Sequence, residues 1–407
     1  MKKVRISAEI LFDGEGHIRR NVRLTLFGGR VVSIEEKIDR RREDAEIRLD
    51  SALVLPGFVN AHTHLELSRH QAEVKDADFI EWLYQMRLKL DAATKEELTK
   101  AALKGIEESL SSGTSALVEH TNAEASLSPL LEAPLRSVIA FEAVGYNQTD
   151  VKKERILAHL RGVKKNDMHR LAIAPHSLYR ASEDLLRFCA DVASKNSLLI
   201  SCHISETKEE VEFFKYGTGR FRSLLERFGA IPYLPNPSGK SPLLLLDDLN
   251  LLTERTLLVH CNYPEGNDFA LIKKRGATVV YCPRSHSFFR HSPHPLELFL
   301  EQDIPVIFGT DSLASTPSLS ILDELKFVKR ERPALPAEKL LSLATRTAAR
   351  LILGEEFGVI REGAPADLCA IKLPHHPASD NSPLELALHP ESEVNLTVVG
   401  GKVVFQK

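Results

Sequence analysis

The sequence predicts a distorted (β/α)8 TIM barrel beside a small β-sandwich domain that both ends of the chain build together. Between residues 57 and about 350, short β-branched runs alternate with longer stretches of helical period, which is typical of parallel strands joined by crossover helices. Both ends contain strand and turn sequences without a long helix. A length of 407 residues, 43% of them hydrophobic, is sufficient for one large domain and an accessory one.

The barrel strands are expected at eight β-branched runs, which cover residues 57–64, 114–121, 136–144, 170–175, 198–203, 256–260, 277–283 and 305–310. Eight such units that close on themselves form a barrel, and barrels of this type carry their active sites at the carboxyl ends of the strands. Candidate catalytic residues are therefore expected where these runs end.

The small domain is expected from the two chain ends. Residues 1–55 contain short strands with turns at "DGEG" and "FGGR", and residues 357–373 and 393–407 are again strand and turn material. We therefore assign 1–55 and 357–407 to the small β domain and 56–356 to the catalytic barrel. The proline- and serine-rich segment 373–390 is expected to be a loop, in which His375 and His376 are solvated rather than bound to a metal.

Composition and charge narrow the class of partner. Lysine and arginine total 53 against 56 acidic residues, and the net charge of −3 gives no electrostatic reason to expect nucleic acid or an anionic membrane as a partner. No hydrophobic run approaches the roughly 18 residues of a membrane helix, and Arg5 and Glu9 interrupt any signal-like segment. The five cysteines form no CxxC pair, which indicates a reducing, cytoplasmic setting. A small-molecule substrate is expected.

Two histidines separated by one residue, His62 and His64 in "PGFVNAHTHLELS", follow the first apolar run. In a strand, positions i and i+2 point to the same face, so both imidazoles are expected at the barrel mouth while Thr63 points away. Alone, the pair is as compatible with two hydrogen-bonded core histidines as with a metal site.

Three further polar residues follow other strands. His203 ends the fifth run, His260 ends the sixth, and Asp311 follows the eighth. Burying an imidazole or a carboxylate without a partner is costly, so packing alone does not account for such groups at four separate strand ends. The pattern indicates an active site.

The ordered motifs extend this indication over nearly the whole chain. They are "LPGFVNAHTHLE", "CHISET", "VHCN", "CPRSH", "GTDS", "REGAPADL" and "VVGGKVV". Together they resemble the amidohydrolase superfamily, in particular its branch of cytosine deaminases, S-adenosylhomocysteine deaminases and chlorohydrolases, with aminodeoxyfutalosine deaminases as a further similar group. Each motif alone is weak, whereas the ordered set is specific.

The resemblance implies that His62, His64, His203 and Asp311 bind one divalent metal ion, usually Zn²⁺ and sometimes Fe²⁺. Imidazole and carboxylate ligands suit zinc and leave a position open for water. The fourth strand ends in "IAPHSLY" and offers no lysine that could be carboxylated to bridge two ions. One metal ion is therefore expected rather than two.

The resemblance also implies the catalytic roles. The metal lowers the pKa of its bound water toward about 7, the resulting hydroxide attacks the ring, and ammonia leaves. Asp311 accepts a proton, Glu206 protonates a ring nitrogen, and His260 orients the attacking hydroxide. Without the "HISE" context, Glu206 would be interpreted as a surface residue that opens the following helix; with it, the catalytic role is favoured. For His260, a core histidine is the less favoured alternative.

Three residues are expected to contact the substrate. Trp82, the only tryptophan, lies in a helix that faces the pocket in similar proteins, although core packing would also explain it. His176 in "APHSLY" matches a phrase that meets the sugar in nucleoside deaminases. His286 lies in "CPRSHSFFRH", which departs from the commoner "CPxSN" and also contains Phe288, Phe289 and His291. These loop residues line the pocket or belong only to the loop.

The leading hypothesis is a metal-dependent deaminase of a purine nucleoside-like compound, of the S-adenosylhomocysteine or aminodeoxyfutalosine type. An alternative keeps the site but displaces chloride or alkylamine from a triazine-like ring, or opens a cyclic amide. A non-catalytic barrel that serves as a scaffold is a third hypothesis, which the complete ligand set disfavours. Because barrels of this sort often associate, a homo-oligomer is also expected.

Overall fold

The eight expected barrel strands are all present in the computed structural model, which describes residues 3–36, 47–70, 78–122, 124–163, 166–237, 239–376 and 382–407. They are β5 (Phe58–Thr63), β6 (Thr114–Thr121), β7 (Arg136–Ala143), β8 (His169–Pro175), β9 (Leu199–Ile204), β10 (Thr256–His260), β11 (Thr278–Tyr281) and β12 (Val306–Phe308). Every neighbouring pair is parallel, and the strands follow one another in chain order.

The barrel closes between its first and last strands through only a few bonds. The backbone N–H groups of Thr310 and Asp311 donate to the carbonyl of His62 at 3.2 and 3.1 Å, and Thr63 forms a single parallel bridge with Asp311. The closure therefore lies at the carboxyl ends of β5 and β12. It brings Asp311 next to the histidine pair.

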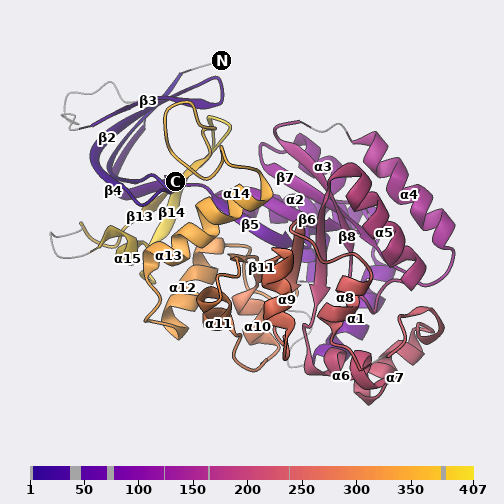
Figure 1. The fold of residues 1–407 in the computed structure, drawn as a ribbon. Coiled ribbons are helices and arrows are strands. Elements are labelled where there is room, and N and C mark those ends of the chain that lie inside the picture. Colours follow the sequence, from indigo (N-terminus) through magenta and orange to yellow (C-terminus); the bar gives the residue numbers. More distant parts are fainter. Residues whose placement is uncertain are drawn as a thin grey trace.

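Helices cover the outer side of the barrel, as Figure 1 shows. Those before β10 are α1 (Phe79–Ala92), α2 (Lys95–Ser111), α3 (Leu127–Glu132), α4 (Thr149–Gly162), α5 (Glu183–Asn196), α6 (Lys208–Tyr216), α7 (Gly219–Arg227) and α8 (Pro242–Asp248). Those after it are α9 (Asp268–Arg275), α10 (Pro283–Phe288), α11 (Leu296–Glu301), α12 (Ile321–Glu331), α13 (Ala337–Ser342), α14 (Ala348–Ile352) and α15 (Pro383–Ala387).

The barrel strands are buried on both faces, as expected for parallel strands. Leu117 and Ile139 belong to a large core that includes apolar side chains of the surrounding helices. Val118 and Ala140 belong to a second core of small side chains between the strands, which Phe357 and α14 help to cover. Alternate residues of the apolar strands therefore pack into two different cores, one under the helices and one between the strands. The polar side chains of the active site lie at the strand ends.

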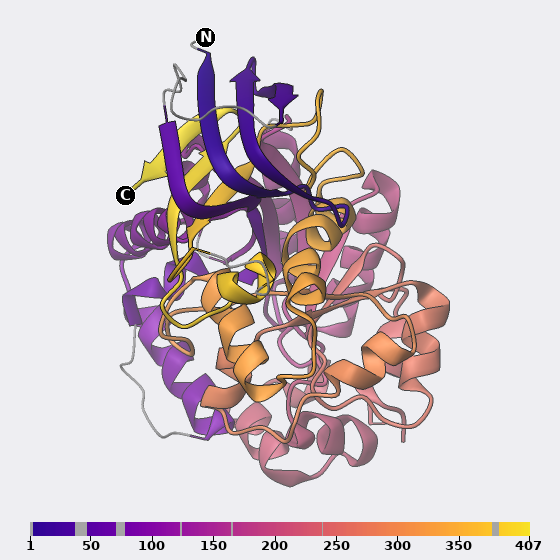
Figure 2. The ribbon, with the colours of Figure 1, turned by 90° about the vertical axis from the view of Figure 1, so that its left-hand side faces the viewer.

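Both chain ends build the expected β domain, which Figures 1 and 2 show beside the barrel with both termini on it. Hydrogen bonds join its strands into one continuous curved sheet around a core of its own. The sheet order is β15 (Lys402–Gln406), β14 (Glu393–Val399), β13 (Leu368–Lys372), β4 (Ile47–Pro56), β1 (Val4–Phe12), β2 (Ile18–Phe27) and β3 (Arg30–Glu35). The exact domain boundaries at 55/56 and 356/357 stay predictions.

The segment 373–390 is not a loop throughout, because α15 occupies part of it. Proline at the first turn and the buried side chains of Leu384 and Leu386 explain this helix. His375 and His376 are exposed, as expected, and residues 377–381 lie outside the described residues. Within the described part of the chain, no helix combines the length and the apolar character that a membrane crossing requires.

Candidate active site

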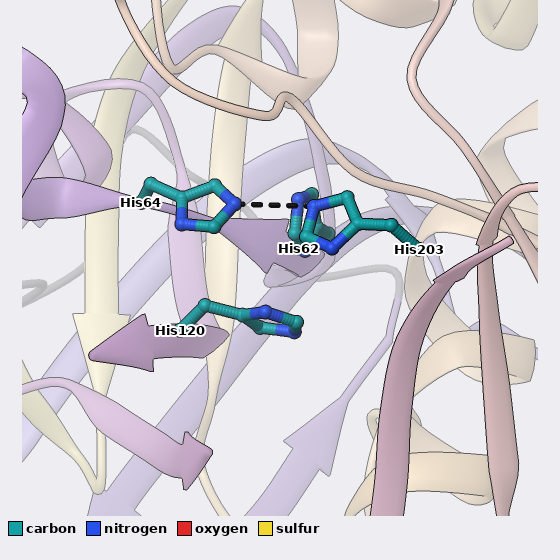
Figure 3. A group of neighbouring side chains, drawn as sticks. All are labelled: His62, His64, His120 and His203. Atoms are coloured by element: carbon teal, nitrogen blue, oxygen red, sulfur yellow. Dashed lines mark hydrogen bonds between the residues drawn. The ribbon is translucent and has the colours of Figure 1, made fainter. Parts of the chain in front are cut away.

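Four buried imidazoles converge at the carboxyl ends of the barrel strands (Figure 3). His62 is the penultimate residue of β5 and His64 follows that strand, while His120 and His203 come from β6 and β9. Their ligand atoms all lie within 4.8 Å of one another. The Nε2 atoms of His64 and His203 are 3.3 Å apart. The predicted pairing of His62 and His64 on one face is therefore present, and Thr63 points away to bond the carbonyl of Val118.

The donor set of this cluster fits a divalent metal ion. Two nitrogen ligands at about 2.0–2.1 Å from one ion in tetrahedral geometry lie about 3.3–3.4 Å apart, which matches the separation of His64 and His203. His62 is 0% exposed, and neither of its ring nitrogens has a hydrogen-bond partner among the described residues. Burial, followed by the neighbouring imidazole of His120, lowers the pKa of His62 well below its ordinary value. A neutral imidazole with a free lone pair is the form that binds metals.

Asp311 presents one carboxylate oxygen to the imidazoles. Its Oδ1 lies 3.7 Å from Nε2 of His62 and 4.0 Å from Nε2 of His64. The hydroxyls of Ser285 and Ser315 donate to Oδ2 at 2.8 and 2.7 Å. Burial alone raises the pKa of Asp311, but the neighbouring imidazoles, His64 first, and the bond from Ser315 outweigh it and hold the pKa below its ordinary value. Asp311 is therefore a fixed carboxylate.

Sequence reasoning missed His120, the fourth member of the imidazole cluster. Its Nε2 lies 2.7 Å from the hydroxyl of Ser201, and its Nδ1 lies 3.5 Å from Oε1 of Glu142 on β7. The signal was present, because "TSALVEHT" also places a histidine near the end of a barrel strand. Applying the strand-end criterion to every strand would have found it.

His203 is oriented by the chain that follows β8. Its Nδ1–H donates to the carbonyl of His176 at 2.7 Å, which leaves the Nε2 lone pair directed into the cluster. The ring of His176 stacks on that of His203 with centroids 4.5 Å apart. Nε2 of His176 lies 3.9 Å from Oε1 of Glu142. One residue thus supports a cluster member through its backbone and presents its own ring beside it.

Glu206 and His260 are two potential proton carriers that lie side by side in the same pocket as the cluster. Oε1 of Glu206 lies 3.5 Å from Nε2 of His260. Glu206 is only 5% exposed and precedes the N-cap Thr207 of α6, so the surface alternative considered from the sequence does not hold. Burial, and then the negative charges of Asp311 and Glu210, raise the pKa of Glu206 well above its ordinary value. Glu206 is therefore suited to carry a proton at neutral pH.

The backbone at the end of β10 is strained. His260 has a φ of +68° and Cys261 a φ of +46°, values that residues with a side chain rarely adopt. The ring of the buried His294 donates from Nε2 to the carbonyl of His260 at 3.1 Å. This bond helps to hold a conformation that directs the imidazole of His260 toward Glu206.

These residues open into a pocket of about 790 Å³, a volume that includes its open mouth. Its lining combines apolar side chains with a few polar groups, which is typical of a small-molecule site. Trp82 on α1 and His176 both line the pocket, together with Glu206, His260 and Asp311. The indole N–H of Trp82 has no partner among the described residues, so it can donate to a ligand. Their contacts with substrate stay predictions.

His286 lies behind the pocket rather than in its lining. Its Nδ1 is 3.1 Å from Oδ1 of Asn262, whose amide donates to the carbonyl of Glu206 at 3.0 Å. Among its loop neighbours, Phe289 packs against Trp82 with ring centroids 5.0 Å apart. The altered loop after the seventh strand therefore contacts pocket residues indirectly, through Phe289 against Trp82 and through Asn262 against Glu206. A contact of His286 with the substrate stays a prediction.

Comparisons with known proteins find similar sequences and similar folds. A family model described as "Amidohydrolase family" matches residues 53–404. The 5-methylthioadenosine/S-adenosylhomocysteine deaminase of Pyrococcus abyssi is 26% identical over 396 residues, which cover 93% of this chain and 88% of that protein.

Two solved structures share the fold over the full chain. An adenosine deaminase from Xanthomonas campestris with bound zinc has a TM-score of 0.86 and 21% identity, covering 99% of this chain and 93% of that one. The aminofutalosine deaminase of Helicobacter pylori has a TM-score of 0.83 and 24% identity, covering 99% of this chain and 100% of that one. The family model spans most of the sequence and includes all four imidazoles and Asp311. The chain therefore belongs to the amidohydrolase family.

Proposed function

We propose that the protein is a metal-dependent hydrolytic deaminase that acts on an amino-substituted heterocycle, specifically a purine nucleoside-like compound. One observation carries the proposal: a buried glutamate and histidine, Glu206 and His260, lie 3.5 Å apart in the same pocket as the imidazole cluster and Asp311. A proton donor, a proton acceptor and a set of metal ligands are the groups that hydrolytic deamination of a heterocycle requires.

His62, His64, His203 and Asp311 would hold the metal ion, with Zn²⁺ as the ion that suits imidazole and carboxylate ligands best and Fe²⁺ as the alternative. His120 lies close enough to join them or to orient a neighbouring ligand. When bound, the ion supplies a nucleophile at neutral pH because it lowers the pKa of water.

The residues of the chain move the protons. Asp311, held as a carboxylate by Ser285 and Ser315, accepts the proton of the attacking water. Glu206 enters the reaction protonated and donates to a ring nitrogen, which makes the adjacent carbon more electrophilic. His260, neutral because burial lowers its pKa, orients the water beside Glu206. Proton transfer to the amino group then lets it leave as ammonia.

The proposed substrate class rests on the pocket and on the names of similar proteins. The relative from Pyrococcus abyssi and the two structural neighbours are named as deaminases of adenine nucleosides or of aminofutalosine. Trp82 offers a flat ring and an N–H that bonds none of the described residues, and His176 offers a second ring beside the cluster. A planar heterocycle with a sugar-like extension suits these groups. S-adenosylhomocysteine and aminodeoxyfutalosine represent the proposed type.

Release of ammonia from a panel of substrates tests this proposal. The panel contains adenosine, 5′-deoxyadenosine, S-adenosylhomocysteine, aminodeoxyfutalosine, a chlorotriazine and a cyclic amide. We expect ammonia from the adenine compounds and neither chloride release nor ring opening. Chloride release or ring opening without ammonia would replace the proposal with the alternative reaction at the same site. No turnover of any compound by the metal-loaded protein would favour a non-catalytic scaffold.

We also propose that the protein works in a reducing cytoplasm as a homo-oligomer. The five cysteines are all buried and unpaired, which suits a reducing compartment. Light scattering at low concentration tests the oligomer, and a monomeric mass would contradict it.

A further inference from the structure

Two residues that follow β10 hold the chain that follows β9. The backbone N–H of Tyr263 donates to the carbonyl of Ser205 at 2.9 Å. The side-chain amide of Asn262 donates to the carbonyl of Glu206 at 3.0 Å. These bonds connect Glu206 to the turn that carries His260, its neighbour at 3.5 Å. Asn262 is buried and lies outside the pocket lining, so it acts on the pocket through Glu206.

His286 of α10 fixes the orientation of the Asn262 amide. Its Nδ1 lies 3.1 Å from Oδ1 of Asn262. Because the amide nitrogen of Asn262 donates to Glu206, the amide oxygen is the acceptor here, and Nδ1 of His286 carries the proton. Burial, followed by the neighbouring His291, lowers the pKa of His286 to about 3, which keeps its ring neutral. A neutral imidazole thus acts as a hydrogen-bond donor behind the pocket.

The loss of His286 would release the carbonyl of Glu206. Asn262 is buried, so its side-chain oxygen would be left without this donor, and an unsatisfied buried acceptor is costly. The amide would turn toward another partner and stop donating to Glu206. The N–H of Glu206 is held separately, because it donates to Glu210 of α6 at 2.8 Å. The carbonyl side of Glu206 therefore depends on His286, and its N–H side does not.

Helix α10 connects the same relay to the proposed base. The hydroxyl of Ser285, the residue before His286, donates to Oδ2 of Asp311 at 2.8 Å. One residue earlier, the backbone N–H and the Nε–H of Arg284 donate to the fully buried carboxyl group of Glu324 at 2.9 and 2.7 Å. The helix is thus anchored to α12, and its consecutive residues support both sides of the reaction.

We propose that His286 is a positioning residue that acts through Asn262 and holds Glu206 where it protonates the ring nitrogen of the substrate. This inference rests on the proposed function. A general acid must lie within hydrogen-bond reach of the atom that it protonates, so a small displacement of Glu206 lowers the rate of the chemical step. Because His286 lies outside the pocket lining, its loss affects kcat and leaves substrate binding nearly unchanged.

Replacement of His286 tests this role in the full-length, metal-loaded protein. The substrate is the adenine compound that the wild type deaminates fastest. His286→Phe keeps a ring in the same space but has no N–H, whereas His286→Gln has an amide N–H that can still donate to Asn262. We expect kcat to fall about fivefold in His286→Phe, the rate equivalent of one buried hydrogen bond, with little change in KM. His286→Gln should recover most of this loss.

His169→Phe is the control for the loss of a buried imidazole. It also loses one hydrogen bond, to Ser137, but His169 lies at the amino end of β8, away from the pocket. It should keep the wild-type kcat. A wild-type kcat in His286→Phe would overturn the inference. A raised KM with an unchanged kcat in His286→Phe would also overturn it, because that result indicates a contact with the substrate.

A double-mutant cycle separates positioning of Glu206 from general structural damage. In the Glu206→Gln background, His286→Phe should cause no further loss of kcat, because the acid that His286 positions is already absent. The same fivefold loss in both backgrounds would show that His286 acts independently of Glu206, and would overturn the inference. Asn262→Leu breaks the link from its other end and should reproduce the loss. It replaces His286→Phe in the cycle if thermal unfolding shows that His286→Phe does not fold.

Crystal structures of the variants keep this test separate from that of the proposed function. The distance between Oε1 of Glu206 and Nε2 of His260 should lengthen in His286→Phe and stay at 3.5 Å in His286→Gln. If no adenine compound is deaminated but this distance changes as expected, the proposed function fails and the positioning of Glu206 stands. If deamination requires Glu206 but neither kcat nor the distance responds to His286→Phe, the inference fails and the proposed function stands.

Discussion

The Nε2 atoms of His64 and His203 lie 3.3 Å apart, although 139 residues separate them along the chain. His203 carries its proton on Nδ1, where it bonds the carbonyl of His176, so its Nε2 offers a lone pair. The barrel fold and one backbone hydrogen bond therefore bring the two basic ring nitrogens together. A shared cation is the partner that such an arrangement favours, and the following predictions depend on it.

Gly309 tests whether the position of His62 controls metal binding. A Cβ at this position would lie 2.8 Å from Cβ of His62 and 3.1 Å from Sγ of Cys282. Gly309→Ala should displace His62 and weaken metal binding by about 10- to 100-fold, the range found when groups that support metal ligands are removed. Metal titration measures this. Gly162→Ala is the control, because no atom of the described residues lies within 4 Å of its added Cβ. Unchanged affinity in Gly309→Ala would contradict the assignment of His62.

Glu206→Gln separates proton transfer from metal binding. Glutamine keeps the shape of the side chain beside His260 but cannot donate the same proton. We expect wild-type metal content and a loss of about 10²- to 10⁴-fold in kcat, the usual contribution of a general acid. Elemental analysis and ammonia release measure both quantities. Deamination at the wild-type rate would remove the role assigned to Glu206.

His294→Phe tests the support of the strained turn at His260. Phenylalanine can keep the stacking on Tyr281, whose ring centroid lies 3.8 Å away, but loses the bond to the carbonyl of His260. We expect kcat to fall about fivefold, with little change in KM, because one buried hydrogen bond contributes about 1 kcal/mol. His169→Phe is the control. His169 begins β8, and its replacement loses a bond to Ser137 of β7 but should leave kcat unchanged. Equal kcat in both variants would contradict the positioning role.

Glu210 should make stability depend on pH. Burial raises its pKa from 4.5 to about 7, although the backbone N–H groups of Ser205 and Glu206 donate to it. Between these values the folded chain holds a proton that the unfolded chain has lost, so stability falls as the pH rises through about 5 to 7. The effect is on the order of 3 kcal/mol.

Urea unfolding at pH 5 and pH 8 measures this effect. Glu210→Gln should reduce the loss of stability between the two values, whereas Glu212→Gln, which replaces an exposed glutamate of the same helix, should not. An identical loss in all three proteins would show that Glu210 does not titrate as expected.

Much of the architecture could be predicted because two features are clear in the sequence: β-branched runs alternate with helical stretches, and polar residues follow the ends of those runs. Each of the eight strands begins within one residue of its expected start and ends within two residues of its expected end, since β-branched runs bounded by helical stretches have few alternatives. His62, His64, His203 and Asp311 meet because the carboxyl ends of parallel strands share one rim.

The rest depends on features that local patterns do not carry. Asp311 and His260 direct their side chains from backbones with positive φ, which a strand pattern does not reveal. The continuity of the end sheet depends on the pairing of β4 with β13, whose residues are more than 300 positions apart. The position of His286 behind Glu206 depends on its bond to Asn262, a contact between two loops.

Reconstitution of the metal-free protein tests the central claim most directly. After removal of metal by a chelator, Zn²⁺ is added in steps while bound metal and ammonia release from an adenine nucleoside are followed together, in the wild type and in His64→Ala. We predict that activity rises in proportion to bound zinc and saturates at one ion per chain, and that His64→Ala gains neither. Full activity without metal, or wild-type zinc binding and turnover in His64→Ala, would contradict the account.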